Sequence, residues 1–390
     1  MNYTRNICII TQEFPLETNF GGIAIFYKNL VDELITENFK VSVITRSKSL
    51  FNSHKINSSL SVYRIGFPFF VKYLTGRFFD KILFSLFAYF FFLKLNRKEK
   101  FNLIESTETY FEGLFLSFNK NYSQKIVIQC HGSNNVNVIP KGLFSFLHSL
   151  DFKLCLLLER FFLKRSYTLI APSKSVLNIL LKNGVDINRI KLLSHGINTD
   201  KFIPKKNKKK SNKLKMLFVG KIQFMKGSDF LWLLVKEINK LENISLNLVG
   251  DVHPNEKNNL NENLKKYPNT LKYTGKVKNE EMFNIYQNHD ILIHPSRSEQ
   301  FGLVYAEAMA SGLIVLAGKN GGSTEIIKDN IDGFIFDPNK DLKRVVNLII
   351  KIKKNKSSYS NFVKKSRKKI INNFSNSRVI DQRISLYKNI

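Results

Sequence analysis

The sequence contains little cysteine, little tryptophan and few acidic side chains. Its 390 residues include three cysteines and one tryptophan, and 31 aspartates and glutamates stand against 61 lysines and arginines. Cys8, Cys130 and Cys155 form no CxxC pair and lie inside apolar stretches. This spacing excludes a disulfide-stapled secreted domain and a cysteine-based zinc site. We therefore expect buried thiols in a protein of a reducing compartment.

Long hydrophobic runs are also absent. At the N-terminus only residues 7–10 are continuously apolar, which is too short for the apolar region of a signal peptide. The longest apolar run covers residues 82–93. As a helix it would span about 18 Å, against about 30 Å of bilayer hydrocarbon. We therefore expect no membrane-spanning helix and a cytoplasmic location.

Positive charge is abundant, with a formal net charge of +30. Residues 201–215 and 351–369 carry eight and nine basic residues and no acidic one. A basic surface favours anionic lipid, nucleic acid or phosphorylated substrates as partners. A solvated lysine-rich surface is the alternative interpretation. Nucleic acid is disfavoured, because the phenylalanines lie in apolar runs and are not interleaved with lysine and arginine.

The first half of the chain alternates short apolar runs with amphipathic segments. Residues 6–11 predict a buried strand, Gly21 and Gly22 open an amphipathic helix, and residues 41–45 predict the next strand. This order is the βαβ unit of a doubly wound sheet, in which a helix N-terminus can bind phosphate. A tight turn is the alternative role of the two glycines. Further strands are predicted at residues 101–105, 125–129, 167–170 and 190–193, with a long soluble helix at 143–163.

A second series of strands follows the lysine-rich segment at residues 204–213, which we interpret as the domain boundary. Its strands are predicted at residues 215–219, 244–249, 271–274, 291–293, 314–317 and 334–336. The fold class is therefore α/β, with two Rossmann-like, doubly wound domains. We expect them at residues 1–200 and 201–370, and a C-terminal helix at 371–390 that packs back on the first domain.

The stretch at residues 299–312, EQFGLVYAEAMASG, predicts a polar loop that enters a helix. Glu299 lies just before the helix N-terminus, and Glu307 lies about two turns inside it. The free N–H groups near Gly302 and Leu303 can bind an anion. Carboxylates are good partners for sugar and ribose hydroxyls. The alternative is a favourable first-turn charge followed by a surface glutamate.

This stretch resembles the E-x7-E signature of retaining glycosyltransferases of family 4, which have the GT-B fold. The likeness covers most of the chain, because further motifs of that family occur in the expected order: Gly21-Gly22, His131-Gly132, APSK at 171–174, GIN at 196–198, Lys226-Gly227 after LFVGK, and Gly321-Gly322 with Glu325. Three positions depart from the pattern. Lys221 stands where arginine is more frequent, His195 replaces an asparagine, and Gln300 replaces a common glycine.

The resemblance implies two domains that face each other across a cleft and a retaining transfer of a hexose-type sugar from a nucleotide-diphosphate sugar. The acceptor would be a glycan or a polyprenyl-linked sugar in surface polysaccharide or glycolipid synthesis. His131, Glu299 and Lys226 would be catalytic, and the donor would be bound by Gly21, Gly22, Lys221, Lys226, Gly302, Leu303, Glu307 and Glu325. Within this set, Glu307 would bind the ribose, and Glu299 and His131 the sugar.

Metal ions are not expected in this site. The sequence has no Asp-x-Asp motif, and its histidines and aspartates are not clustered at ligand spacing. Lysines and backbone N–H groups could instead stabilise the departing diphosphate. We therefore predict that no metal and no cofactor is required besides the donor. Surface lysine is the alternative for Lys221 and Lys226.

The sequence also offers candidates for the acceptor side and for contact with a membrane. Glu105 and Glu108 follow a strand of the first domain and are the acceptor-side candidates, with a solvated loop as the alternative. The helix near residues 78–93 is apolar almost all round and flanked by basic residues, which favours peripheral attachment to an anionic membrane or packing in the core. A GT-B epimerase or phosphorylase, or a non-catalytic basic protein, are the competing functions.

Overall fold

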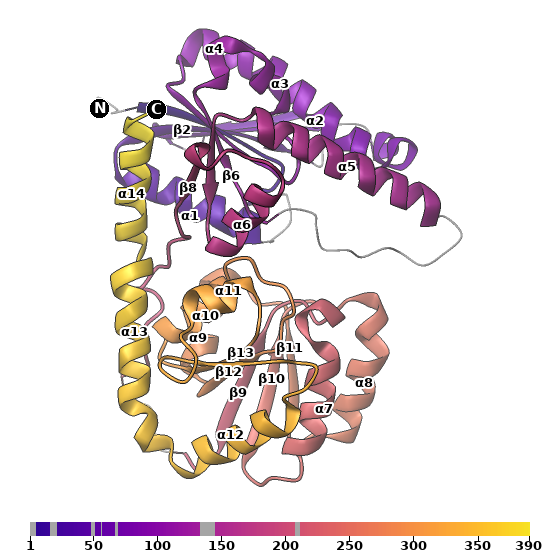
Figure 1. The fold of residues 1–390 in the computed structure, drawn as a ribbon, viewed down its shortest axis with the longest axis vertical. Helices are drawn as coiled ribbons and strands as arrows, with labels where there is room; N and C mark the ends of the chain where they lie inside the picture. Colours follow the sequence, from indigo (N-terminus) through magenta and orange to yellow (C-terminus); the bar gives the residue numbers. More distant parts are fainter. Residues whose placement is uncertain are drawn as a thin grey trace. The chain divides into compact units, whose positions relative to one another are not determined.

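The computed structural model describes residues 5–15, 22–47, 51–55, 57–66, 69–132, 145–206 and 211–390. The chain divides into two compact units, called unit 1 and unit 2 here (Figure 1). Unit 1 comprises Met1–Leu193 together with Ile380–Ile390, and unit 2 comprises Ser194–Val379. The boundary therefore falls before residue 200, and the described part of the lysine-rich segment at 204–213 belongs to unit 2.

Unit 1 is built on an eight-stranded sheet with the order β3-β4-β2-β1-β5-β6-β7-β8. Its pairs are parallel except β3 with β4. The strands are β1 (Arg5–Thr11), β2 (Phe39–Arg46), β3 (Phe51–Lys55), β4 (Leu60–Ile65), β5 (Leu103–Thr107), β6 (Ile126–Gln129), β7 (Thr168–Ala171) and β8 (Ile190–Leu192). The antiparallel β3 and β4 were absent from our prediction, and the others match it closely.

Helices cover both faces of this sheet (Figure 1). They are α1 (Gly22–Thr36), α2 (Phe69–Glu99), α3 (Leu114–Phe118), α4 (Lys120–Ser123), α5 (Ser145–Arg165) and α6 (Lys174–Lys182). Residues of α2, α3, α5 and α6 share one hydrophobic core with the sheet. Ser173 caps α6, because its hydroxyl accepts the Val176 N–H at 3.3 Å. Within the described residues, no helix has the length and apolarity needed to cross a bilayer.

Unit 2 contains a six-stranded parallel sheet with the order β11-β10-β9-β12-β13-β14. Its strands are β9 (Leu214–Val219), β10 (Ile244–Val249), β11 (Leu271–Gly275), β12 (Ile291–His294), β13 (Ile314–Gly318) and β14 (Phe334–Phe336). All six lie within one residue of the predicted ranges. Strands buried on both faces of a parallel sheet are continuous apolar runs, and such runs are easily recognised.

Two separate cores lie on the two faces of the unit 2 sheet. The helices are α7 (Ser228–Ile238), α8 (Lys257–Lys266), α9 (Met282–Gln287), α10 (Leu303–Ala310), α11 (Gly321–Ile326), α12 (Leu342–Lys354), α13 (Ser360–Phe374) and α14 (Asn376–Lys388). One core contains residues of α7, α8 and α12, and the other contains residues of α9, α10, α11 and α13. This arrangement is the doubly wound architecture that the sequence predicts.

The end of α14 belongs to unit 1, where a buried ion pair holds it. The Arg383 guanidinium donates to both carboxylate oxygens of Glu105, at 3.0 Å each. The Tyr387 hydroxyl donates to the same carboxylate, and Arg383 also donates to Gln129. Arg383, Tyr387 and Glu105 are all buried. The last residues of the chain therefore complete the interior of unit 1 at the middle of β5.

Candidate functional site

The strand order of unit 2 reverses between β9 and β12. β10 and β11 follow β9 on one side, whereas β13 and β14 follow β12 on the other. Loops that leave the carboxyl ends of the strands diverge at such a point, and open α/β sheets bind their ligands there. The loops after β9, β12 and β13 carry Lys226, Glu299 and Gly322, so we build the candidate site from these three residues.

Lys226 and Glu299 form an ion pair across two of these loops. Nε2 of His294 lies 3.4 Å from the same Glu299 oxygen. Burial favours the protonated form of Glu299, but the Lys226 ammonium and the His294 ring outweigh it and lower the pKa to about 2. Glu299 is therefore ionised at neutral pH. Lys226 is partly buried and paired with Glu299.

His294 was not among our predicted site residues. It ends β12 and is buried, with its ring stacked on Phe218 at 5.3 Å between centroids and edge-on to Tyr305 at 5.4 Å. Burial lowers its pKa, although Glu299 opposes this effect. The signal for it in the sequence is a histidine at the end of an apolar run, five residues before Glu299.

Gly302 and Gly322 allow the loops after β12 and β13 to pack closely. Gly302 has φ +88° at the N-cap of α10, and an added Cβ would lie 2.3 Å from the Tyr305 ring. The Gly322 N–H donates to the Glu299 carbonyl at 2.7 Å, and a Cβ there would lie 2.6 Å from the Phe301 carbonyl oxygen. Both glycines are thus required by the fold, and Leu303 begins α10 beside them.

Asn320 connects the same two loops and was also missed. Its side-chain amide donates to the Ser296 and Gly318 carbonyls at 2.9 Å and to the Tyr305 hydroxyl at 3.2 Å. Its side-chain oxygen accepts the Ser323 N–H and caps α11. A single asparagine before two glycines gives no sequence signal for these contacts. These contacts of Asn320 fix the position of Gly321–Glu325 (GGSTE), at the start of α11, within the site.

Glu307 lies on α10, where its carboxylate accepts the Tyr286 hydroxyl at 2.8 Å. Burial raises the pKa of Glu307 to about 7, although Tyr286 and Lys201 oppose this effect. Lys221 is exposed on the loop after β9, and Glu325 is half-buried on α11. The structure therefore brings Lys226, Glu299 and Gly322 at the start of α11 into contact. No hydrogen bond described for these residues joins Lys221 to them.

In unit 1 the strand order reverses between β1 and β5, and His131 follows the neighbouring strand β6. The His131 N–H donates to Glu108 at 2.6 Å, and its ring meets Phe26 edge-on with 5.1 Å between centroids. Burial lowers the pKa of His131 to about 3, and the Arg383 charge adds to this effect. The imidazole is therefore neutral at physiological pH and can act as a hydrogen-bonding group.

The two acceptor-side candidates are buried carboxylates, so the alternative of a solvated loop is wrong. Glu105 is 0% exposed and bound by Arg383, which favours a structural role over contact with an acceptor. Glu108 is also buried, and burial, with the Glu159 charge, raises its pKa to about 8. Its contact with the His131 N–H indicates that it holds the His-Gly loop in place.

Two further features of unit 1 are the buried Glu112 and Gly22, the first residue of α1. Glu112, which we did not predict, accepts the Gln12 N–H at 2.9 Å and the Thr107 hydroxyl at 2.6 Å, so it joins the segments that follow β1 and β5. Gly22 opens α1, and an added Cβ there would meet no atom within 4 Å. Gly21 lies outside the described residues.

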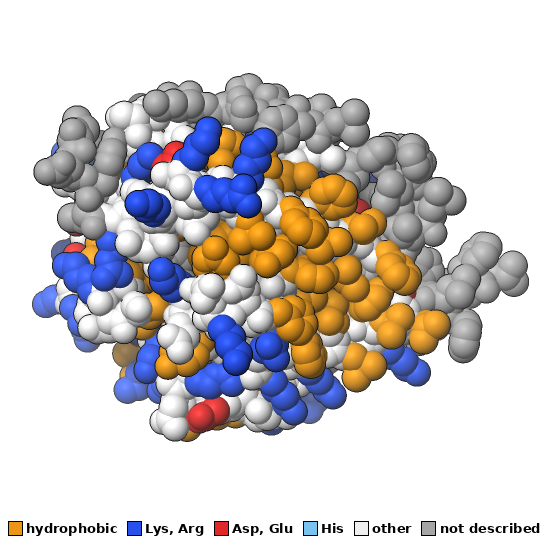
Figure 2. All heavy atoms as spheres, turned by 90° about the horizontal axis from the view of Figure 1, so that it is seen from above, with side chains coloured by type: hydrophobic (Ala, Val, Ile, Leu, Met, Phe, Trp, Pro, Cys, Tyr) orange, Lys and Arg blue, Asp and Glu red, His pale blue; other side chains and the backbone are white. Residues whose placement is uncertain are grey.

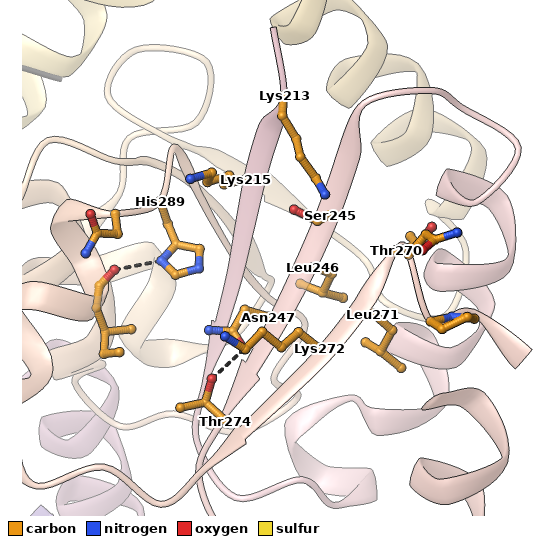
Figure 3. A pocket seen from close by; sticks show the side chains of 14 residues that line it. Lys213, Lys215, Ser245, Leu246, Asn247, Thr270, Leu271, Lys272, Thr274 and His289 are labelled. Carbon is orange, nitrogen blue, oxygen red and sulfur yellow. Dashed lines mark hydrogen bonds between the residues drawn. The ribbon is translucent and has the colours of Figure 1, made fainter. Parts of the chain in front are cut away.

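A cavity of about 530 Å³ occupies another part of unit 2 (Figure 3). Its lining includes Lys213, Lys215, Asn247, Lys272 and His289. These residues lie at the amino ends and middles of β9, β10 and β11, or just before β12. The cavity therefore lies away from the carboxyl ends of the strands, and it includes none of the predicted site residues.

Comparison with known proteins accounts for both units. The model described as "Glycosyltransferase Family 4" matches residues 20–201, and the model "Glycosyl transferases group 1" matches residues 199–369. A protein of Klebsiella pneumoniae described as an uncharacterized 41.2 kDa protein in cps region is 26% identical over 352 residues, which cover 85% of this chain and 87% of that protein.

Solved structures share the fold. Sucrose-phosphate synthase from Thermosynechococcus elongatus has a TM-score of 0.80 at 19% identity and covers 99% of this chain and 98% of its own. Anabaena HepE, solved in complex with UDP-glucose, has a TM-score of 0.73 at 15% identity and covers 99% of this chain and 100% of its own. With both halves matched by the family models, the chain belongs to the family 4 glycosyltransferases and has the GT-B fold.

Proposed function

We propose that this glycosyltransferase moves a hexose-type sugar, with retention of configuration, from a nucleotide-diphosphate sugar to a glycan or lipid-linked acceptor. The products would belong to a surface polysaccharide or glycolipid. The observation that carries the proposal is the Lys226–Glu299 pair at the point where the strand order of unit 2 reverses. The UDP-glucose bound by Anabaena HepE, which has the same fold, supports this donor class.

In the proposed site, the donor diphosphate takes the Lys226 ammonium as its counter-ion, with Lys221 and the N–H groups of Gly302 and Leu303 around it. Two phosphate charges compete well with one carboxylate for a lysine, so donor binding releases Glu299 to the sugar hydroxyls. These cations and dipoles stabilise the diphosphate as it departs, without a metal ion. The Gly22 N–H at the start of α1 is a further donor in this proposal, together with the N–H of Gly21, which precedes it in the sequence.

Glu307 accepts the ribose hydroxyls in this proposal, and Glu325 shapes the sugar pocket. The neutral His131 imidazole hydrogen-bonds the sugar and orients it. The bond between the anomeric carbon and the donor phosphate breaks, and the acceptor oxygen bonds to the same face of that carbon. A donor phosphate oxygen takes the acceptor's proton, so no protein nucleophile or base is consumed.

The first experiment is a thermal-shift panel of UDP-, GDP- and ADP-sugars with the intact chain. We expect one base to raise the unfolding temperature of the protein, and that nucleotide sugar to release nucleoside diphosphate when an acceptor is added. No stabilisation by any of the three, combined with salt-sensitive binding to random oligonucleotides, would identify a non-catalytic nucleic-acid binder. Turnover that changes the donor sugar without an acceptor, or that needs inorganic phosphate, would identify an epimerase or phosphorylase.

The proposed location is cytoplasmic, on the inner face of an anionic membrane that holds the lipid-linked acceptor. The basic composition of the chain supports an anionic partner.

A further inference from the structure

An apolar surface is exposed on α2, α3 and α5 of unit 1, and we call it the apolar face. Its large hydrophobic side chains are 46% to 62% exposed and comprise Phe79, Phe87, Phe90, Phe118, Leu150, Leu157 and Phe161. Figure 2 shows hydrophobic side chains gathered in one area, with lysines and arginines along its borders. Scattered exposed hydrophobics are ordinary, but a continuous patch marks a surface that binds something apolar.

The two long helices contribute to the core with one side and to the apolar face with the other. On α2, Phe84 and Phe92 are buried while Phe87 and Phe90 are exposed. The membrane and core interpretations of this helix are therefore compatible.

Contacts between the three helices make the apolar face one surface. The Phe78 N–H on α2 donates to Asp151 on α5 at 2.9 Å. The rings of Phe118 on α3 and Phe161 on α5 lie 6.0 Å apart.

The contribution of α5 differs from our expectation. Charged residues spread through the sequence of this segment predicted an ordinary soluble helix. The structure instead buries Glu159 and exposes Leu157 and Phe161. The charges of α5 are thus sorted by sign, because Glu159 is buried and Asp151 accepts the Phe78 N–H, whereas the described basic side chains face solvent.

The same sorting holds for both long helices. Their four acidic residues are all engaged within unit 1: Asp80 is bound by Arg46, Glu99 by Lys40, Asp151 by the Phe78 N–H, and Glu159 is buried. Their exposed cations are Lys94, Arg97, Lys98, Lys153, Arg160, Lys164 and Arg165. A face of this kind presents hydrocarbon and positive charge together.

We propose that the apolar face inserts shallowly into an anionic lipid bilayer, with these cations among the phosphate headgroups. Such helices lie in the plane of the interface and bury their apolar side about 5–10 Å deep. A second copy of this chain fits poorly, because a two-fold contact would bring two sets of cations together without carboxylates to pair them. The inference rests on the proposed function in one respect: membrane binding would give the enzyme access to a lipid-linked acceptor.

The test is co-sedimentation of the intact chain with vesicles of phosphatidylcholine alone and of equimolar phosphatidylcholine and phosphatidylglycerol. We expect binding to the anionic vesicles that weakens as salt is added, and little binding to the neutral ones. Leu157→Ser should weaken vesicle binding roughly tenfold, because a leucine loses its burial in hydrocarbon. Arg160→Glu should weaken binding roughly fivefold for each unit of charge changed.

Matched controls come from α7 of unit 2. Leu233, which is 53% exposed, and the exposed Lys236 provide Leu233→Ser and Lys236→Glu, which should leave vesicle binding unchanged. The proposal fails if the anionic vesicles are not bound at moderate salt, or if the α5 and α7 variants behave alike. It also fails if Leu157→Ser dissociates a dimer seen by light scattering, because the occupant is then a second copy.

Donor binding is measured separately, so the two proposals can fail independently. Stabilisation by nucleotide sugar and turnover with a soluble acceptor should be unchanged in Leu157→Ser. If the wild-type chain shows neither stabilisation by nucleotide sugar nor turnover, the proposed function is contradicted. The result with vesicles is unaffected by that outcome. Thermal unfolding of each α5 variant at the temperature of the wild-type chain shows that the variant is folded.

Discussion

Unit 1 and unit 2 share a doubly wound sheet but hold their acidic residues differently. In unit 2, Glu299 and Glu307 are only partly buried, and neighbouring side chains hold them, Lys226 and His294 for Glu299 and Tyr286 for Glu307. In unit 1, Glu105 and Glu108 are fully buried and bind other parts of the fold. A carboxylate near the carboxyl end of a strand is therefore not sufficient evidence for a ligand site. The exposed fraction of the carboxylate and the groups that bind it indicate whether it is available to a ligand or stabilises the fold.

The largest expected effect is the loss of the buried ion pair in unit 1. Glu105→Ala leaves Arg383 buried without its carboxylate, which should lower the free energy of unfolding by about 3–5 kcal/mol. The matched change in unit 2 is Asp229→Ala, because Asp229 is 43% exposed where it pairs with Arg297. The loss should be about 0–1 kcal/mol, because Asp229 is half-exposed and Arg297 keeps its hydrogen bonds to Phe224 and Asn339. Chemical denaturation of both variants measures the difference, and equal losses would contradict the contrast between the units.

His131→Ala tests the neutral imidazole of unit 1. We expect kcat to fall roughly 100-fold, because a misplaced sugar loses its alignment for reaction. The affinity for the donor should change only a few-fold. Steady-state kinetics combined with calorimetric titration of the donor separates the two quantities. Equal losses in kcat and affinity would reduce His131 to a simple binding residue.

Glu307→Gln should give the opposite pattern in unit 2. Hydrogen bonds to a charged group contribute about 1.5–3 kcal/mol, so donor affinity should fall roughly 10- to 150-fold. Since burial raises the pKa of Glu307 to about 7, the wild-type affinity should increase with pH through neutrality, and the variant should lose this dependence. Donor-induced thermal shifts at several pH values measure both effects. An unchanged shift in the variant would mean that Glu307 does not bind the ribose.

The smallest effect, counted per pH unit, is the contribution of Glu108 to the pH dependence of stability. Burial raises its folded pKa to about 8 from an ordinary 4.5, so the folded state keeps a proton that the unfolded chain releases. Stability should therefore fall as pH rises between these values, by up to about 1.4 kcal/mol per pH unit from this group. Glu108→Gln removes the titration and should flatten the decline. Denaturation curves at pH 5 and pH 8 test this, and parallel declines would contradict it.

The sequence predicted unit 2 better than unit 1 for a physical reason. β13 (IVLAG) is a continuous apolar run that is buried on both faces of the sheet, whereas β3 (FNSHK) pairs with one neighbour at the sheet edge and has no such pattern. Lys226 and Glu299 were found through the order of motifs along the chain. The partners His294, Tyr286 and Asn320 were not, because packing that brings distant segments together selects them. The contact of Glu105 with Arg383 was not predicted either, because the two residues lie 278 positions apart.

That separation has a consequence for how the chain is made. Synthesis runs at about 5–20 residues per second, so the 278 residues between Glu105 and Arg383 take about 14–56 s to add. During this interval unit 1 has its strands but lacks the cation that neutralises the middle of β5. The ribosome therefore delivers unit 2 complete before unit 1 can close, although unit 1 begins first. A chain that ends before Arg383 lacks the partner of the Glu105 carboxylate, so unit 1 should be less stable in it.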